Sequence, residues 1–357
     1  MRRAMLVVAA LMLAASAHAA SGPSTFSIVA YDSVTQELGV AVQSKYFAVG
    51  RVVPWAEAGV GAVATQANVN TSYGPKALAM LKTGMQPAEI LAALAATDSA
   101  WAGRQLGIVD AHGHVATWTG PKCSDWAGGE TGADFTAQGN ILAGPAVVSG
   151  MAKAFRASSG RELSERLLAA LEAAQAAGGD KRGQQSAALI VVRPSVRHPE
   201  FAQRFVDLHV EDHVTPIKEL ARLLQIHQGF HGAGDHMELA LEYEAVGRAD
   251  LARLERERVH DTMVAALQRN EKDATLLNGL AWSCAVHDVH LDDALRAADR
   301  AAQLQPNSTD ILDTLAEVHY RMGNTAKAIE VETRAAKLDP KNRYLTDQIA
   351  RFQSGAK

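Results

Sequence analysis

The chain has 357 residues, more than a single hydrophobic core usually supports, so we expect two domains. Hydrophobic residues make up 48% and charged residues 21%, which excludes a disordered chain, and 2 cysteines are too few for a disulfide scaffold. The formal net charge at pH 7 is −4, so the chain lacks the basic excess that binding to nucleic-acid phosphates requires. We therefore expect a globular protein that does not bind nucleic acid.

The first twenty residues have the features of an export signal. Arg2 and Arg3 form a short positive start, and residues 4–15 are an uncharged apolar run that is too short to span a bilayer. Residues 17–19 then supply the small-residue pattern that signal peptidase recognises. We expect residues 1–20 to be a signal peptide, the mature chain to be periplasmic or secreted, and no stable membrane insertion after cleavage. The alternative is an uncleaved N-terminal anchor.

Hydrophobic alternation predicts strands through the first third of the mature chain, and proline marks the helices between them. Pro75 and Pro87 each suit the first turn of a helix, and Gly84 ends the first of the two. The strands are expected at 25–31, 38–43, 60–67, a hairpin over 105–119, and 135–142.

The second helix pair and the last strands continue the same pattern. Helices are expected at 145–157 and at 163–177, the second ended by two glycines, and then strands at 186–192 and 205–210. A final helix is expected at 216–227. Strands and helix pairs are segregated along the chain, which indicates antiparallel sheets with helices packed outside them.

Beyond residue 228 the sequence changes character. A glycine-rich stretch predicts a linker at 229–236, and the remainder, 237–357, has helical periodicity throughout. Pro306 and Pro340 lie 34 residues apart, and each follows a helix–turn–helix pattern. This period resembles that of tetratricopeptide repeats, with residues 238–272 as a degenerate earlier copy. Such repeats stack into an array with a concave surface, so we expect a protein partner there.

Two patterns in the sequence raise the question of whether the protein binds a cofactor or a metal ion. The glycines of residues 59–64 lack the strand–turn–helix context of a dinucleotide site, so no cofactor is expected. His209, Glu211 and His213 would share one face of a strand and offer metal ligands, but a charged, solvent-facing edge strand explains them more simply. Metal-dependent hydrolysis stays as the distant alternative.

The only cysteines, Cys123 and Cys284, fall in segments assigned to different domains. We therefore expect no disulfide between them, and neither has the neighbouring cysteine that a metal site would need.

Several segments resemble one family. They are TFSIVAYD at 25–32, LGVAVQSKYFAVG at 38–50, QGNILAGP at 138–145 and GGDKRGQQSAALIVV at 178–192. They are similar to the domain of unknown function 1028 family of bacteria and archaea, which is assigned to the N-terminal-nucleophile (Ntn) hydrolase superfamily. The resemblance covers about 25–227 and implies an α+β fold, a four-layer αββα sandwich at 25–228, followed here by the all-α helical repeat domain.

The resemblance also implies amide hydrolysis by the first residue of the mature chain. In Ntn hydrolases the free α-amine, with a pKa of about 7.7–8.0, acts as the general base for the adjacent hydroxyl. By position in the motifs, Thr25 is the candidate nucleophile. Signal removal alone would leave Thr25 inside the chain, so this chemistry needs cleavage between Ser24 and Thr25. Further catalytic candidates, placed by position only, are Ser44, Lys45, Asn68, Asn140, Asp180 and Ser186.

These placements suggest different roles. Lys45 would lower the pKa of the attacking group, Asn68 and Asn140 would donate to the oxyanion, and Asp180 and Ser186 would orient the α-amine.

Two functions follow as hypotheses. The first is an exported Ntn-type amidohydrolase that cleaves amide or peptide-like bonds, with cell-wall material as the substrate class the family suggests. The second is a catalytically inactive Ntn-fold scaffold that binds a partner through its repeats. Either is compatible with a homo-oligomer, and whether the chain is an enzyme stays open between them.

Overall fold

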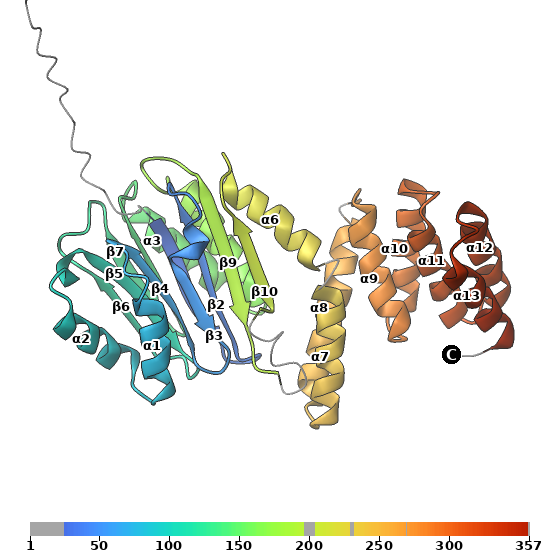
Figure 1. Cartoon of the computed structure of the whole chain (residues 1–357), viewed down its shortest axis with the longest axis horizontal. Coiled ribbons are helices and arrows are strands. Elements are labelled where there is room, and N and C mark those ends of the chain that lie inside the picture. Colours follow the sequence, from blue (N-terminus) through green and yellow to red (C-terminus); the bar gives the residue numbers. More distant parts are fainter. Residues whose placement is uncertain (1–24, 196–203, 229–231, 269, 356–357) are drawn as a thin grey trace, which may run out of the picture.

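The computed structural model describes residues 25–195, 204–228, 232–268 and 270–355. A strand-rich region comes first and a run of helices follows it (Figure 1). The signal peptide predicted at 1–20 lies outside the described residues. Among the helices of the described ranges, none combines the length and apolar character needed to cross a membrane.

The first sheet is built around the predicted hairpin of β1 (Thr25–Asp32) and β2 (Glu37–Ser44), which pair antiparallel. The sheet has six strands in the order β10-β9-β2-β1-β8-β7, and every neighbouring pair is antiparallel. The outer strands are β7 (Gly128–Gly132), β8 (Phe135–Asn140), β9 (Ser186–Val192) and β10 (Val206–Val210).

The second sheet has four strands in the order β3-β4-β5-β6. Two strands that the sequence patterns did not predict, β3 and β7, each form an edge of a sheet. β3 begins with proline and β7 reads GGETG, and such residues give a weak strand signal because they suit edges rather than centres. The strands of this sheet are β3 (Pro54–Glu57), β4 (Gly61–Ala67), β5 (Arg104–Asp110) and β6 (Val115–Thr119).

Helices cover both outer faces of the stacked sheets. Phe26 and Ile28 of β1 belong to one buried cluster with α3, α4 and α6, and Val63 and Ile108 belong to another with α1 and α2. The domain is therefore a four-layer αββα sandwich, which confirms the predicted fold. These helices are α1 (Tyr73–Lys82), α2 (Pro87–Thr97), α3 (Ala146–Ala157), α4 (Leu163–Ala176) and α6 (Pro216–His227).

Strand alternation decides which side chains enter the layer between the sheets. Along β1, Phe26 and Ile28 face the helices, whereas Val29 packs in the inter-sheet cluster with Ala62 and Ala64 of β4. Ser27 lies on the same face as Val29 and donates a hydrogen bond across to the second sheet. Thr25, two residues before Ser27, therefore faces the inter-sheet layer as well.

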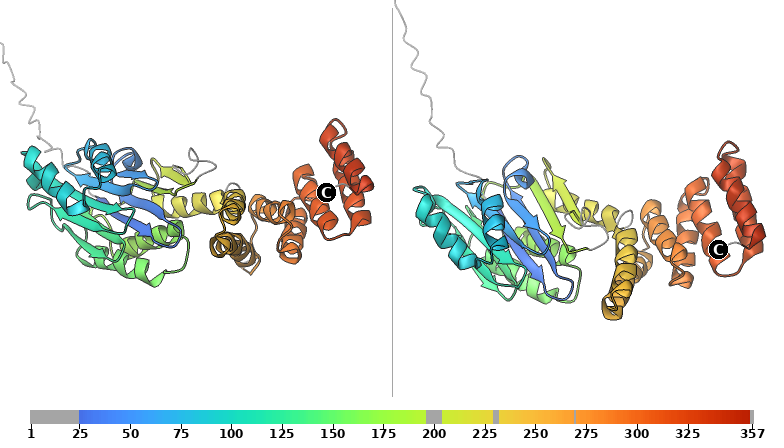
Figure 2. Two further views of the ribbon diagram at one scale, coloured as in Figure 1. Left: turned by 90° about the horizontal axis from the view of Figure 1, so that it is seen from below. Right: turned by 60° about the horizontal axis from the view of Figure 1, so that its bottom comes forward.

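The C-terminal region is all helix and continues away from the sandwich (Figure 2). α9 and α10 form one of the predicted repeats, α11 and α12 form the next, and alanines such as Ala281, Ala298 and Ala316 allow close packing in one continuous core. α7 begins at Ala233, so the expected linker at 229–236 overlaps its first turn. The helices are α7 (Ala233–Ala245), α8 (Ala249–Gln268), α9 (Ala274–Val286), α10 (Leu291–Leu304), α11 (Thr309–Arg321), α12 (Thr325–Leu338) and α13 (Arg343–Ser354).

Buried ion pairs join the two regions. Arg193, directly after β9, is 1% exposed and lies 3.0 Å from Glu37 Oε1 of β2 and 3.1 Å from Glu255 Oε1 of α8. His236 of α7 lies 2.6 Å from Glu255 and 3.2 Å from Glu162. We call Glu37, Glu162, Arg193, His236, Glu255 and Arg258 the junction cluster. It lies where β2 begins and β9 ends, which is the opposite end of the sheet from Thr25.

Candidate functional site

Four predicted residues lie side by side across the six-stranded sheet. The strand register pairs Ser186 of β9 with Ser44 of β2, Ser44 with Thr25 of β1, and Thr25 with Asn140 of β8. Directly opposed residues of antiparallel strands share a face, and here that face is the inter-sheet layer. All four are buried, with exposed fractions of 0–2%. We call Ser186, Ser44, Thr25 and Asn140 the hydroxyl row.

Thr25 is held at both its side chain and its backbone. Its Oγ1 donates to Ser44 Oγ at 3.2 Å, and its carbonyl oxygen accepts from Gln66 Nε2 at 3.5 Å. The branched Cβ of threonine leaves few χ1 rotamers, so the contact with Ser44 fixes the direction of the hydroxyl. Ser44 is therefore a direct neighbour of the candidate nucleophile.

Buried glutamines connect the hydroxyl row to the second sheet. Gln66 Nε2 of β4 donates to Gln105 Oε1 of β5 at 2.8 Å, and Gln66 Oε1 accepts from Ser27 Oγ at 2.8 Å. Gln138 Nε2 of β8 donates to the same Ser27 Oγ at 2.6 Å. The three glutamines are fully buried and hydrogen-bonded, as buried amides need to be. We call Ser27, Gln66, Gln105, Gln138 and Asn140 the amide network.

Gln105 is the centre of this network. Its Oε1 accepts from Asn140 Nδ2 at 2.9 Å as well as from Gln66, and its Nε2 donates to the carbonyl of Gly139 at 2.8 Å and to Thr119 Oγ1 at 2.9 Å. Gln105 and Gln138 were not among the predicted site residues. A glutamine inside a predicted strand, as in RQLGIVD and FTAQGN, is the signal that would have identified them, because glutamine is seldom buried.

Lys45 lies on the rim of the site. It is exposed, its Nζ reaches the carbonyl oxygen of Gln184 at 3.2 Å, and its backbone N–H donates to Asp180 Oδ2 at 2.9 Å. The contact of the Lys45 side chain therefore leads away from the hydroxyl row. Its predicted effect on the pKa of the attacking group has no geometric support among these contacts.

Asp180 and Ser186 hold the loop that follows β2. Asp180 accepts from the backbone of Lys45 and, through Oδ1, from the backbone N–H of Arg182 at 2.8 Å. Ser186 Oγ donates to the carbonyl of Tyr46 at 2.5 Å and accepts from the N–H of Val49 at 3.0 Å. These contacts show both side chains positioning a loop. Their predicted role in orienting an α-amine stays a prediction.

Asn68 follows the end of β4 and is exposed. Its backbone N–H donates to the carbonyl of Gly103 at 3.1 Å, and its own carbonyl accepts from the Arg104 guanidinium. A Cβ at Gly103 would lie 2.8 Å from Asn68 Nδ2, so the amide rests on that glycine. Asn68 is thus packed on the rim of the second sheet, whereas Asn140 lies within the hydroxyl row.

The histidine pattern at the edge strand does not form a compact ligand set. β10 ends at Val210, so Glu211 and His213 lie beyond the strand and do not continue its face. His209 Nε2 lies 2.7 Å from Asp207 Oδ1, and the hydrogen bond to that carboxylate raises the pKa of His209 despite its burial. In the described ranges no group of three or more His, Cys, Asp or Glu residues is placed to hold a metal ion.

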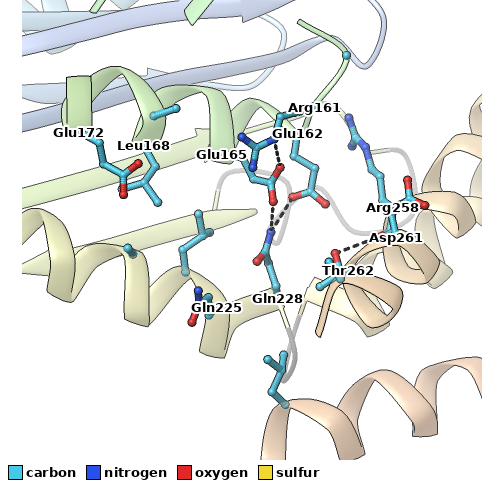
Figure 3. Close-up of a pocket in the computed structure, with 16 residues that line it drawn as sticks. Arg161, Glu162, Glu165, Leu168, Glu172, Gln225, Gln228, Arg258, Asp261 and Thr262 are labelled. Atoms are coloured by element: carbon cyan, nitrogen blue, oxygen red, sulfur yellow. Dashed lines mark hydrogen bonds and ion pairs between the residues drawn. The ribbon is translucent and has the colours of Figure 1, made fainter. Parts of the chain in front are cut away.

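A cavity of about 540 Å³ lies between α4, α6 and α8, away from the hydroxyl row (Figure 3). Its charged walls are largely paired with one another: Arg161 Nε lies 2.9 Å from Glu165, and Gln228 Nε2 donates to Glu165 at 3.3 Å. None of the predicted catalytic residues lines this cavity. It belongs to the junction between the two regions.

Both cysteines are free thiols, as expected from their assignment to different domains. Cys284 is buried in the helical core, and burial raises the pKa of its thiol to about 12. Cys123 is half-buried, and its Sγ donates to the carbonyl of Arg104 at 3.4 Å.

One solved structure shares the fold of the sandwich domain. The crystal structure of a Silicibacter pomeroyi protein, itself matched to the DUF1028 family, is 33% identical, with a TM-score of 0.52 over 57% of this chain and 86% of that chain. The NMR structure of the first TPR domain of human RPAP3 aligns at 15% identity and a TM-score of 0.25, over 35% of this chain and 92% of that chain. No curated protein matches the chain. The sequence model described as "Family of unknown function (DUF1028)" matches residues 25–220, more than half of the chain. The chain therefore belongs to the DUF1028 family of unknown function.

Proposed function

We propose that this protein is an Ntn-type amide hydrolase with the Thr25 hydroxyl as its nucleophile. The observation that carries the proposal is the hydroxyl row, in which Thr25 opens β1 between Ser44 and Asn140 at one end of the inter-sheet layer. The match to the family also begins at Thr25. A threonine in this position, aimed by a second hydroxyl and backed by buried amides, supports nucleophilic attack on a carbonyl.

The reaction begins once the peptide bond before Thr25 is cleaved. The new α-amine accepts the proton of Thr25 Oγ1, and Oγ1 attacks the carbonyl carbon of the bound amide. The proton passes to the leaving amine as the C–N bond breaks, which leaves an acyl ester on Oγ1. A water molecule then attacks the ester, its proton returns to Oγ1, and the carboxylic acid product departs.

The neighbours of Thr25 have distinct tasks in this scheme. Ser44 accepts the Thr25 hydroxyl hydrogen bond in the resting state and fixes its rotamer. Asn140, whose amide donates to Gln105, pairs with Thr25 across the strands, and an amide N–H in this position would stabilise a developing oxyanion. Because the buried partners are neutral, no fixed charge of the network opposes an α-amine with a pKa near its ordinary value.

Export and a cell-wall amide as substrate are part of the same proposal. The positive start, the apolar run and the small-residue pattern of residues 1–20 support export, and an exported amidase meets amide bonds of the cell envelope. The helical repeats would then hold a protein partner. Cell fractionation of the full-length protein tests the location: recovery in the periplasm supports it, and recovery in the cytoplasm contradicts it.

Turnover of amide substrates tests the chemistry. The processed wild-type chain is assayed against N-acyl amino acids, dipeptides and peptidoglycan-derived amides, beside Thr25→Ala and Thr25→Ser. We expect Thr25→Ala to lower turnover by at least about 10³-fold, and Thr25→Ser to retain part of it, since only the first removes the nucleophile. Thr83→Ala, at an exposed helix end, is the matched control. Full activity of Thr25→Ala would reject Thr25 as nucleophile.

The alternative, an inactive scaffold acting through its repeats, predicts a different outcome. The repeat array and its buried attachment to the sandwich are the observations that favour it. In that case Thr25→Ala would leave binding of the partner unchanged. A pull-down with the full-length chain would recover the same partner from both.

A further inference from the structure

The loop from Lys45 to Ala48 leads directly away from Ser44 of the hydroxyl row. Its start is held by Asp180, which accepts the Lys45 N–H, and its centre by Ser186, whose Oγ donates to the Tyr46 carbonyl. We call residues 45–48 the rim loop. Each of these side chains comes from a segment far away in the sequence, so the loop is fixed to the sandwich rather than only to its own ends.

The end of the rim loop is equally constrained. Ala48 adopts φ 53°, a left-handed conformation that is unfavourable for alanine and needs support from its surroundings. Its N–H donates to the carbonyl of Glu211 at 3.0 Å. Beyond it, a Cβ at Gly50 would lie 2.2 Å from His209 Nδ1, so the chain passes against β10 where only glycine fits. The loop conformation is therefore set before any ligand binds.

This rigid loop exposes two aromatic side chains. Tyr46 is 42% exposed and Phe47 is 59% exposed, and Val214 on the neighbouring segment is 82% exposed. That segment is tied to the same corner, because the N–H of His213 donates to Gln185 and the N–H of Gln185 donates to Ser44. Scattered single apolar residues on a surface need no explanation, but two aromatics on a preorganised loop that directly follows Ser44 of the hydroxyl row are a usual form of a recognition element.

We propose that Tyr46 and Phe47 form an aromatic rim that binds an apolar group next to the amide bond that is cleaved. The substrates would be amides with an aliphatic or aromatic substituent beside the reacting carbonyl, rather than small or purely polar amides. Rigid aromatic rings lose little conformational freedom on binding, so the fixed loop favours recognition. Asp180 and Ser186 act as positioning residues for this rim. This inference rests on the proposed function, and the test separates the two.

Covalent labelling by a matched pair of β-lactones is the first test. The two probes differ only in the substituent beside the carbonyl, hexyl in one and methoxymethyl in the other, and the readout is the rate of adduct formation on Thr25. We expect the processed wild-type protein to react at least about 10-fold faster with the hexyl probe. Tyr46→Ala/Phe47→Ala should bring the two rates within about 2-fold of each other, because the hexyl group loses its contact with the rings.

A control variant and two different negative results separate the aromatic rim from the nucleophile. Val34→Ala changes an apolar residue that is 60% exposed in the turn between β1 and β2, and it should behave as the wild type. Labelling of Thr25 with no preference for the hexyl probe, or with a preference that survives in the double variant, overturns the aromatic rim but leaves the nucleophile in place. Failure of both probes to label Thr25 rejects the proposed function.

A binding measurement decides on the rim even without catalysis. Saturation-transfer NMR with hexanamide and acetamide should show contact of hexanamide with the wild-type protein and its loss in Tyr46→Ala/Phe47→Ala. Equal signals from the wild type and the double variant overturn the rim. Analytical ultracentrifugation tests whether a second copy of the chain covers these rings instead. A wild-type dimer that becomes monomeric in the double variant would show that it does, and this result would also contradict the proposal.

Discussion

The two ends of the six-stranded sheet use the same strands for opposite kinds of chemistry. At one end, the hydroxyl of Thr25 contacts the neutral hydroxyl of Ser44 and its carbonyl contacts the neutral amide of Gln66. At the other end, Glu37 and Arg193 are buried as charges and paired with Glu255 of α8. In the proposed mechanism, these neutral groups leave the reactivity of the Thr25 hydroxyl to be adjusted by the α-amine of Thr25. Buried charges are costly to separate, so they suit a junction that must stay closed.

The charged end of the sheet should also depend on pH, because its ion pairs contain groups with shifted pKa values. Burial lowers the pKa of His236, but Glu162 and Glu255 outweigh it and raise the pKa to about 9. Burial raises the pKa of Glu162, but His236 outweighs it and lowers the pKa to about 2. The stabilisation from His236 is complete below about pH 6.5 and lost as pH rises through 9. That from Glu162 is complete above about pH 4.5 and lost as pH falls towards 2. The junction is thus strongest from about pH 5 to 6.5.

Arg193→Met breaks the charged end and has the largest expected effect on stability. It leaves Glu37 and Glu255 buried without their main partner, so we expect the free energy of unfolding to fall by about 3–5 kcal/mol. Urea unfolding followed by circular dichroism measures the loss. Arg253→Met is the matched control, because Arg253 is exposed and pairs with the half-exposed Glu257, and it should change the value by less than about 0.5 kcal/mol. Equal effects of the two variants would mean that the junction pairs are not stabilising.

Gln105→Leu breaks the neutral end. The change leaves the amides of Gln66 and Asn140 and the carbonyl of Gly139 without their shared partner, which should lower the free energy of unfolding by about 2–4 kcal/mol. It should also slow labelling of Thr25 by β-lactones, which Arg193→Met should leave unchanged because it acts at the opposite end. Gln225→Leu, on an exposed part of α6, is the control. If Gln105→Leu and Arg193→Met slowed labelling of Thr25 equally, the two ends of the sheet would not be independent.

His236→Gln sharpens the comparison through pH. Because the charged form of His236 is the stabilising one, the variant should be less stable than the wild type by about 1–3 kcal/mol at pH 6. The difference should shrink between pH 7 and 10, as the wild type loses the imidazolium proton. Unfolding measured at pH 6, 8 and 10 checks this trend. A difference that stays constant over this range would show that His236 is not charged in the junction.

Glu332→Gln, in α12 of the helical repeats, tests the same rule that a buried charge needs a partner. Glu332 is fully buried, and neither of its carboxylate oxygens has a hydrogen-bond partner among the described residues. Burial raises the pKa of Glu332 most, and the negative charges of Asp313 and Glu317 of α11 raise it further. Arg351 of α13 lowers it, and the net result is a pKa of about 8. A carboxyl whose pKa is raised in the folded state destabilises the fold when it ionises. The protein therefore loses stability as pH rises from the unfolded-state pKa of the group towards 8.

The variant should therefore be more stable than the wild type by about 1–2 kcal/mol at pH 9 and nearly equal at pH 5. Thermal unfolding at the two pH values gives the comparison. Glu330→Gln, exposed and paired with Lys327, is the control and should show no such pH trend. A gain for Glu332→Gln that is the same at pH 5 and pH 9 would contradict the raised pKa.

Much of the fold follows from local sequence signals. The alternation in TFSIVAY and the apolar run SAALIVV predicted β1 and β9 to within one residue, and Pro216 marked the start of α6. These elements are predictable because each buries one face or both faces and has a proline or glycine at its end. The edge strands β3 and β7 were missed since edges tolerate the glycines and prolines that weaken the pattern.

The site was predictable only in part, because its partners are far apart in the sequence. Family motifs identified Thr25, Ser44 and Asn140, and the register brings them together. Nothing local shows that Gln105 would meet Asn140, or that Arg193 would find Glu37 and Glu255 and not face solvent. The roles of Asp180 and Ser186 as anchors of the rim loop also depend on contacts across more than a hundred residues.

Mass spectrometry of the mature protein tests the central claim most directly. The full-length chain is purified after expression with its own N-terminal segment, treated with the hexyl and methoxymethyl β-lactones, and mapped by peptide sequencing. The account predicts a chain that begins at Thr25 and carries a single adduct on the Thr25 hydroxyl. A chain that retains Ser24 before Thr25, or an adduct on any other residue, would contradict it.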